Sequence, residues 1–192
     1  MYRTRRTTLG VLLAAGAGSR FTGAEHKLLA LLKGAPIVSY ALSAMVSAGF
    51  EANIVVTGSV ALNSVLGDVT EVHNADWVTG QRSSVLTAIS YAQAHDFESI
   101  VIGLADQPFI TPEAWQAVAE SDSPIAIATY DGARGNPVKL SSAVWDLFIN
   151  TVGDPDAGAR TLIHLHPELV REVACKGNSA DIDTTEDLSK WI

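Results

Sequence analysis

The stretch that decides the fold is LGVLLAAGAGSRF, residues 9–21. Its first six residues form an aliphatic run with the length of a buried parallel strand. The run leads directly into a loop that contains Gly16 and Gly18, and glycine allows a backbone to approach a ligand closely. In open parallel sheets ligands bind beyond the carboxyl ends of the strands, so this loop is the first candidate for a site.

Short aliphatic or β-branched runs alternate with helical patterns along the rest of the chain. Strands are expected at residues 9–14, 52–57, 69–73, 99–104, 124–129 and 137–140. Helices are expected at residues 36–48, 60–66, 84–94, 112–120, 142–150 and 158–165, with a last helix from Thr184. This alternation predicts an α/β fold, a three-layer αβα sandwich around a doubly wound, mostly parallel, Rossmann-like sheet. One domain over residues 9–192 accounts for every element, and residues 1–8 are expected to be a flexible basic leader.

The chain of 192 residues is acidic, since 13 Lys and Arg face 21 Asp and Glu, a formal charge of −8. Arg3, Arg5 and Arg6 lie in the leader, which leaves 10 basic against 21 acidic groups in residues 9–192, a balance of −11. Non-specific binding to nucleic acid needs many Lys and Arg contacts to phosphates, so a nucleic acid is excluded as a partner.

Composition also bears on the compartment. No apolar run approaches the roughly 20 residues of a membrane-spanning helix, so no membrane partner is expected. Cys175 is the single cysteine, which excludes an intramolecular disulfide and a zinc site built from Cys ligands. The apolar run after the basic start leads into the glycine loop without a signal-peptide cleavage site. These features favour the cytoplasm.

The loop after the first strand carries the signs of an anion site. Backbone N–H groups around Gly16 and Gly18 can form an anion-binding nest, while Arg20 and Lys27 supply positive charge. No Gly-Lys-Ser/Thr follows, which excludes a Walker loop, and Phe21 stands at the third glycine position of the Rossmann motif. A structural tight turn is the alternative, but the two cations favour a cradle for a triphosphate.

Carboxylates follow two other apolar runs. Asp106 comes directly after residues 99–104, where a carboxylate can hold Mg²⁺ beside nucleotide phosphates. Asp181 and Asp183 lie two residues apart, on one side of an extended segment, so either could complete that metal site. The alternatives are a turn at Asp106 and capping of the helix that begins at Thr184.

These segments together resemble the MobA-like nucleotidyltransferases, and within them the molybdenum cofactor cytidylyltransferases. The match keeps the family's order with LAAGAGSRF and Lys27, the segment from Asn74 to Ser84, LADQP at 104–108, RGNPV at 134–138, GDPDAGAR at 153–160 and DIDTTEDL at 181–188. Ala15 after Ala14, in place of glycine, is similar to members that use CTP rather than GTP.

The resemblance implies roles for individual residues. The nucleotide would be bound by Leu13, Ala14, Ala15, Gly16, Gly18, Ser19, Arg20, Lys27, Asn74, Gly80, Ser83 and Ser84. Arg20, Lys27 and Asp106 would be catalytic. Mg²⁺ would be held by Asp106 and Asp183, with Asp181 as the alternative second ligand.

The resemblance also implies a reaction. CMP would pass from CTP to the terminal phosphate of molybdopterin or the molybdenum cofactor, a phosphorylated pterin, with release of pyrophosphate. A molybdoenzyme or its chaperone would receive the product. The alternatives are a GTP-using or other-acceptor enzyme of the same fold and a non-catalytic protein that binds a pterin cofactor.

The chain departs from the family pattern in the half expected to hold the acceptor. Asn136 stands where the family commonly has His, and the segment at 153–160 is two residues longer. Ala75 replaces a usual Pro. Asparagine offers a donor and an acceptor but does not titrate near neutral pH, so a contact made through the His must differ here.

Overall fold

The structure is a computed structural model that describes residues 7–192. Most of the predicted leader, residues 1–6, lies outside the described residues. Thr8 is the first residue of strand β1 (Thr8–Ala14) and is buried, because it pairs with the next strand of the sheet. The prediction that the leader extends through residue 8 was therefore wrong at its last residue.

The main sheet has seven strands, in the spatial order β5-β4-β1-β6-β8-β7-β9. Besides β1 they are β4 (Ala52–Thr57), β5 (Thr70–His73), β6 (Ser99–Leu104), β7 (Ile125–Tyr130), β8 (Ala133–Ser141) and β9 (Val170–Ala174). All neighbouring pairs are parallel except those that involve β8, which runs antiparallel to both β6 and β7. The predicted doubly wound, mostly parallel sheet is confirmed.

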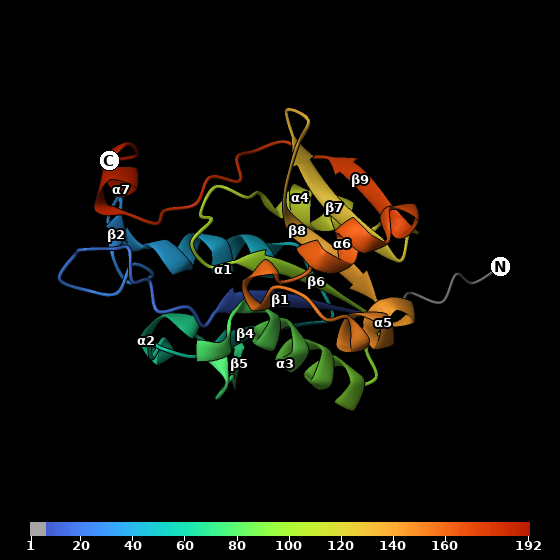
Figure 1. The fold of residues 1–192 in the computed structure, drawn as a ribbon. Coiled ribbons are helices and arrows are strands. Elements are labelled where there is room, and N and C mark those ends of the chain that lie inside the picture. Colours follow the sequence, from blue (N-terminus) through green and yellow to red (C-terminus); the bar gives the residue numbers. More distant parts are fainter. Residues whose placement is uncertain (1–6) are drawn as a thin grey trace.

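Helices cover both faces of this sheet (Figure 1). They are α1 (Ile37–Ser47), α2 (Asn63–Leu66), α3 (Gln81–Ala94), α4 (Pro112–Ala119), α5 (Trp145–Asn150), α6 (Arg160–Leu165) and α7 (Thr185–Ser189), with single 3₁₀ turns η1 (Trp77–Thr79), η2 (Ser142–Val144), η3 (Pro155–Ala157) and η4 (Pro167–Leu169). No helix among residues 7–192 is long and apolar enough to span a membrane.

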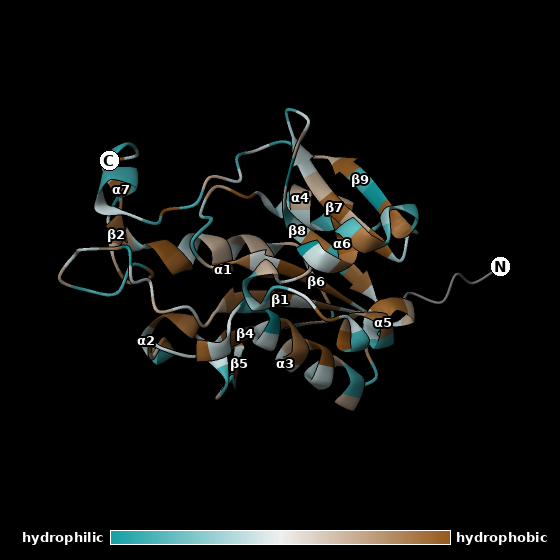
Figure 2. Ribbon diagram, viewed as in Figure 1, coloured by the Kyte–Doolittle hydropathy of each residue, from teal (hydrophilic) through white to brown (hydrophobic). Residues whose placement is uncertain are grey.

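Two large apolar cores lie on either side of the sheet. One joins β1 to α1, α2 and α4, and the other joins β1 to α3, α5 and α6. Because side chains alternate between the faces of a strand, Leu12 enters the first core while Val11 and Leu13 enter the second. The apolar colour is accordingly concentrated in the central strands (Figure 2). These are the three layers that the sequence predicts.

Some elements differ from the prediction. Strand β9 and the short pair β2 (Leu31–Leu32) and β3 (Ala35–Pro36) were not expected. β9 lies at the sheet edge and is only partly buried, so it lacks an aliphatic run. Helix α3 begins at Gln81, three residues earlier than predicted. Its first turn is polar and faces a cavity, so it lacks the apolar residues from which the helix was predicted.

Candidate functional site

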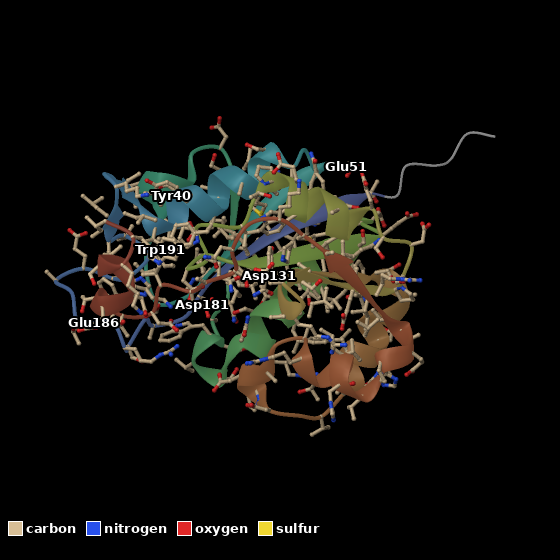
Figure 3. All side chains as sticks on the ribbon, turned by 90° about the horizontal axis from the view of Figure 1, so that it is seen from above. Tyr40, Glu51, Asp131, Asp181, Glu186 and Trp191 are labelled. Carbon is tan, nitrogen blue, oxygen red and sulfur yellow. The ribbon has the colours of Figure 1, made fainter. Side chains whose placement is uncertain are left out.

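The sheet register brings three distant segments together. β1 and β6 are parallel neighbours with Leu13 opposite Leu104, so the loops that follow them leave the sheet side by side. The Ala105 N–H donates to the Leu13 carbonyl at 3.0 Å. The Ile182 N–H donates to the Asp106 carbonyl at 2.9 Å, which fixes the C-terminal segment on the same edge. Figure 3 shows Asp181 on this segment, which leads into α7.

A cluster of four charges occupies this meeting point. Lys27 Nζ lies 2.5 Å from Asp106 Oδ2 and 2.8 Å from Asp183 Oδ1. Arg20 Nη2 lies 3.0 Å from Asp183 Oδ2. The Lys27 side chain is 11% exposed and that of Arg20 is 73% exposed, so the lysine is fixed inside the cluster while the arginine lies at its mouth.

The surroundings shift the pKa of Lys27 in this cluster and that of Asp181 beside it. Burial alone would lower the pKa of Lys27, but the charges of Asp106 and Asp183 and their hydrogen bonds outweigh burial, and the net pKa is raised. Lys27 therefore stays cationic at neutral pH. Burial raises the pKa of Asp181, with repulsion from Asp106 as the next cause. Asp181 therefore lies close enough to Asp106 and Asp183 to be repelled by their charges.

The cluster opens into a cleft of about 690 Å³. Ten of the predicted nucleotide-binding residues line it, namely Leu13, Ala14, Ala15, Gly16, Gly18, Ser19, Arg20, Lys27, Gly80 and Ser84. Asp106, Asp181 and Asp183 line the same cleft. The structure therefore brings the predicted loop, lysine and carboxylates to a single place.

Asn74 and Ser83 lie behind the cleft wall instead of lining it. Asn74 is buried, and its Nδ2 donates to the Ser83 and Ser84 hydroxyls at 2.8 and 3.0 Å. Its Oδ1 accepts from the Asp76 N–H at 3.0 Å. These bonds join the segment before η1 to the first turn of α3, so Asn74 and Ser83 position the wall of the cleft.

The loop after β1 is braced from outside the cleft. The Gly16 carbonyl accepts from Ser59 Oγ at 2.7 Å and from His26 Nε2 at 3.1 Å. His26 Nδ1 accepts from the Leu28 N–H at 3.3 Å, so the ring is neutral with its proton on Nε2. Burial lowers the pKa of His26, which agrees with the neutral form. Gly18 has φ +62°, a conformation that favours glycine.

A second cavity of about 680 Å³ adjoins the cleft. Residues shared by both cavities are Arg20, Gln81, Leu104, Arg160, Asp181 and Asp183. The second cavity is also lined by Arg134 and Asn136, the segment in which the sequence departs from its family pattern. Two ligands could thus lie on either side of one cluster of charges.

Two residues of the cleft were not predicted from the sequence. Gln81 lines both cavities but was overlooked because helix α3 was predicted to begin later. Asp156 lines the cleft from η3, within the segment at 153–160 that is two residues longer than the family pattern. Arg82, the next residue, lines neither cavity and donates to three carbonyls at the end of α5, at 2.7 to 3.0 Å. A helical wheel that starts at Gln81 places Gln81 and Arg82 on different faces of α3.

The acidic residues fit a divalent cation. Asp106 Oδ1 is buried and has no hydrogen-bond partner among the described residues, while Oδ2 contacts Lys27. An orphaned carboxylate oxygen of this kind is costly unless a ligand engages it. Residues 7–192 contain no group of three or more His, Cys, Asp or Glu side chains arranged as a metal site. Mg²⁺ nevertheless suits the site, because it binds through one or two carboxylates together with substrate phosphates.

Comparison with known proteins gives a family and close relatives. Residues 10–172 match the model of the MobA-like NTP transferase domain. The chain is 32% identical to nicotine blue oxidoreductase of Paenarthrobacter nicotinovorans, over 95% of both chains. It is 28% identical to the purine catabolism protein PucB of Bacillus subtilis, over 93% of both. A crystal structure of Rv0371C from Mycobacterium tuberculosis in complex with manganese superposes with a TM-score of 0.74 and 25% identity, covering 96% of this chain and 97% of that one.

Proposed function

The chain belongs to the MobA-like NTP transferase family, a family of nucleotidyltransferases, and from this membership we propose its reaction. It transfers CMP from CTP to the terminal phosphate of a molybdopterin-type acceptor and releases pyrophosphate. The observation that carries the proposal is the placement of Lys27 between Asp106 and Asp183 in the cleft, where Asp183 and Arg20 also line the second cavity. A triphosphate in one cavity and a phosphorylated acceptor in the other would meet there.

The proposed step needs little proton transfer. An oxygen of the acceptor phosphate attacks the α-phosphorus, the new P–O bond forms, and the bond to the leaving pyrophosphate breaks. Because the attacking phosphate is already ionised at neutral pH, catalysis rests on positioning and on neutralising charge. The loop amides, Arg20 and Lys27 bind and orient the phosphates and stabilise the charge that develops on them.

Asp106 and Asp183 would hold Mg²⁺, with Asp181 as the alternative to Asp183. When bound, the ion supplies electrostatic stabilisation to the phosphate oxygens. The orphaned Oδ1 of Asp106 supports this assignment. Lys27 and Arg20 now occupy the other oxygens of the cluster, and an anionic substrate would draw both cations toward itself and leave the carboxylates to the metal. The manganese complex of the Rv0371C protein is in keeping with a divalent cation in this fold.

CTP is proposed as the nucleotide because Ala15 lines the cleft where glycine is typical of GTP-using members. The name of one relative, nicotine blue oxidoreductase, raises a redox reaction as a second candidate. The match of residues 10–172 to the NTP transferase domain, together with two cations beside a glycine loop that suit phosphates, favours the transferase. A GTP-using enzyme, another phosphorylated acceptor, or a silent pterin-binding protein are the remaining alternatives.

The test is a pyrophosphate-release screen of four NTPs, with and without a molybdopterin-type acceptor, across a Mg²⁺ titration. We expect release with CTP only when the acceptor and Mg²⁺ are present. Lys27→Ala should lower turnover by about 10² to 10³, as loss of one transition-state donor does. Asp106→Ala should lower it further and abolish the response to Mg²⁺. Lys176→Ala, an exposed lysine outside both cavities, is the control.

Unchanged turnover in Lys27→Ala would contradict its catalytic role. Mg²⁺-independent turnover in Asp106→Ala would place the metal elsewhere. If no NTP releases pyrophosphate while the protein oxidises or reduces a coloured pyridine-type substrate, the redox reading replaces the transferase.

A further inference from the structure

Gln107 lines the second cavity and contacts Asp181, which lies beside the charge cluster. The side-chain amide of Gln107 has only one hydrogen-bonding orientation. It is 5% exposed, and its Nε2 donates to Asp181 Oδ1 at 2.6 Å and to the Ser179 carbonyl at 3.0 Å. The Ser179 carbonyl can only accept a hydrogen bond, so the amide nitrogen of Gln107 must face it. The amide oxygen of Gln107 therefore points the opposite way.

Asn136 continues this series and takes its orientation from Gln107. Its Nδ2 donates to Gln107 Oε1 at 3.0 Å, so its own Oδ1 faces away from Gln107. The Asn136 carbonyl accepts from Tyr130 Oη at 2.7 Å, which holds the backbone in place. No donor within residues 7–192 reaches Asn136 Oδ1, and the residue lines the second cavity.

We propose that Asn136 is a specificity-determining residue, whose Oδ1 accepts a hydrogen bond from a ring-bound amino group of the acceptor. This inference rests on the proposed function and specifies which edge of the acceptor ring is bound in the cavity. A carbonyl oxygen only accepts, so the ligand group must be a hydrogen-bond donor, which an amino group on the ring provides through its N–H. Ile102, Ile127 and Val138 line the same cavity and offer an apolar surface to a flat ring.

Because Asn136 replaces the family's His, the side chain at this position can only accept a hydrogen bond from the ligand. A histidine nitrogen donates or accepts according to its tautomer, so it would read either kind of ring edge. Asn136 is bound through its nitrogen, and it reverses only if Gln107 reverses. Gln107 is prevented from doing so by its two acceptors. The series of hydrogen bonds from Asp181 through Gln107 to Asn136 thus leaves Asn136 Oδ1 as a hydrogen-bond acceptor that faces the cavity.

The test uses two fluorescent probes without nucleotide or metal, so it is independent of turnover. Pterin carries the 2-amino group, and 4-hydroxypteridine lacks it. We expect wild-type protein to bind pterin about tenfold more tightly, the value of one net hydrogen bond. Asn136→Leu should bind both probes with equal affinity. Asn150→Leu, on the end of α5 and outside both cavities, should keep the wild-type preference.

Gln107→Met provides a second variant that leaves Asn136 in place but frees its amide to rotate. It should reduce the preference for pterin while ring binding persists, with folding checked by thermal melting. Equal binding of both probes by the wild type, or an undiminished preference in Asn136→Leu, would overturn the proposal. Binding of neither probe would overturn it as well, and pyrophosphate release with another phosphorylated acceptor would show that the transferase function stands without it.

Discussion

Gly16 lies in the loop after β1, and the fold itself does not require glycine there. Its φ lies outside the left-handed region, and a Cβ would meet no protein atom within 4 Å. The space beside it belongs to the cleft. The missing side chain therefore serves the close approach of a ligand rather than packing.

Gly16→Ala should consequently leave the melting temperature within about 2 °C of wild type, since its effect on the free energy of unfolding is at most about 0.5 kcal/mol. The KM for the nucleotide should rise about tenfold or more, because the added methyl group displaces the phosphates from the loop amides. Steady-state kinetics and a thermal melt check the two effects. A large fall in melting temperature with an unchanged KM would show that Gly16 is structural.

His26 makes the loop sensitive to pH. Its folded pKa is lowered by burial below the ordinary value of 6.5, so the unfolded chain takes up a proton first as the pH falls. Stability is present in full above pH 6.5 and is lost as the pH falls below it. Protonation also turns Nδ1 into a donor that opposes the Leu28 N–H.

We expect the melting temperature and nucleotide affinity of the wild type to fall together below about pH 6.5, and His26→Gln, which does not titrate, to lack this part of the dependence. Melts and nucleotide titrations from pH 5 to 8 measure it. An identical pH profile in the two proteins would remove His26 from the explanation.

At the scale of elements, the short helix α7 positions Asp183. Thr184 caps it, with its Oγ1 accepting from the Asp187 N–H at 3.1 Å, and Asp187 Oδ2 accepting from the Thr184 N–H at 3.1 Å. Such a capping box fixes the chain immediately before the helix, which is where Asp183 lies. The hydrogen bond to Lys190 is the largest cause that lowers the pKa of Asp187, to about 2, so the box keeps its charge at neutral pH.

Thr184→Ala should cost about 1 kcal/mol of unfolding free energy and raise the Mg²⁺ concentration needed for half-maximal activity, because Asp183 is less well placed. Thr111→Ala is the matched control. Thr111 caps α4 through the Ala114 N–H at 3.3 Å, and it lines neither cavity. Similar stability losses with a Mg²⁺ effect in Thr184→Ala alone would support the role of the cap. An equal Mg²⁺ shift in both variants would count against it.

The elements also show which features the sequence could predict. Buried strands such as β1 and β6 are continuous aliphatic runs, and Thr111 and Thr184 are of a residue type that is preferred at helix N-caps. Both kinds of feature were therefore predicted from the sequence. Strand β9 is paired on one side only and is half exposed, so its composition does not separate it from a loop.

The residues of the site likewise include some that the sequence could predict and some that it could not. The glycine loop and Asp106 follow the parallel neighbours β1 and β6 directly, so the register of these strands places them together. Lys27 lies beyond the glycine loop and reaches Asp106 through its long side chain. The orientation of Gln107 and Asn136 depends on the C-terminal segment and on β8, which are far apart in sequence. Neighbours on a helix face different directions, so Gln81 lines the cleft while Arg82, the next residue, points to the end of α5.

For the whole molecule, the site draws on segments from residue 13 to residue 183, which come from both sides of the sheet. A ligand that contacts them together should therefore stabilise the complete fold, by RT ln(1 + [L]/Kd). CTP with Mg²⁺ at about 100 times Kd should contribute about 2.7 kcal/mol, which raises the melting temperature by roughly 5–10 °C in a domain of this size. Differential scanning fluorimetry measures the shift.

The carboxylates make that stabilisation depend on the metal. Without Mg²⁺ the triphosphate would approach Asp106, Asp181 and Asp183 with like charge, so CTP alone should shift the melting temperature by much less. In Asp106→Asn the site loses the negative charge that would attract the cation, and the difference between CTP and Mg-CTP should disappear. Ser19 contributes no carboxylate to the cleft, so Ser19→Ala should retain that difference even if its affinity falls. A metal effect that persists in Asp106→Asn would mean that Mg²⁺ acts on the nucleotide in solution and that the acidic cluster serves Lys27 alone.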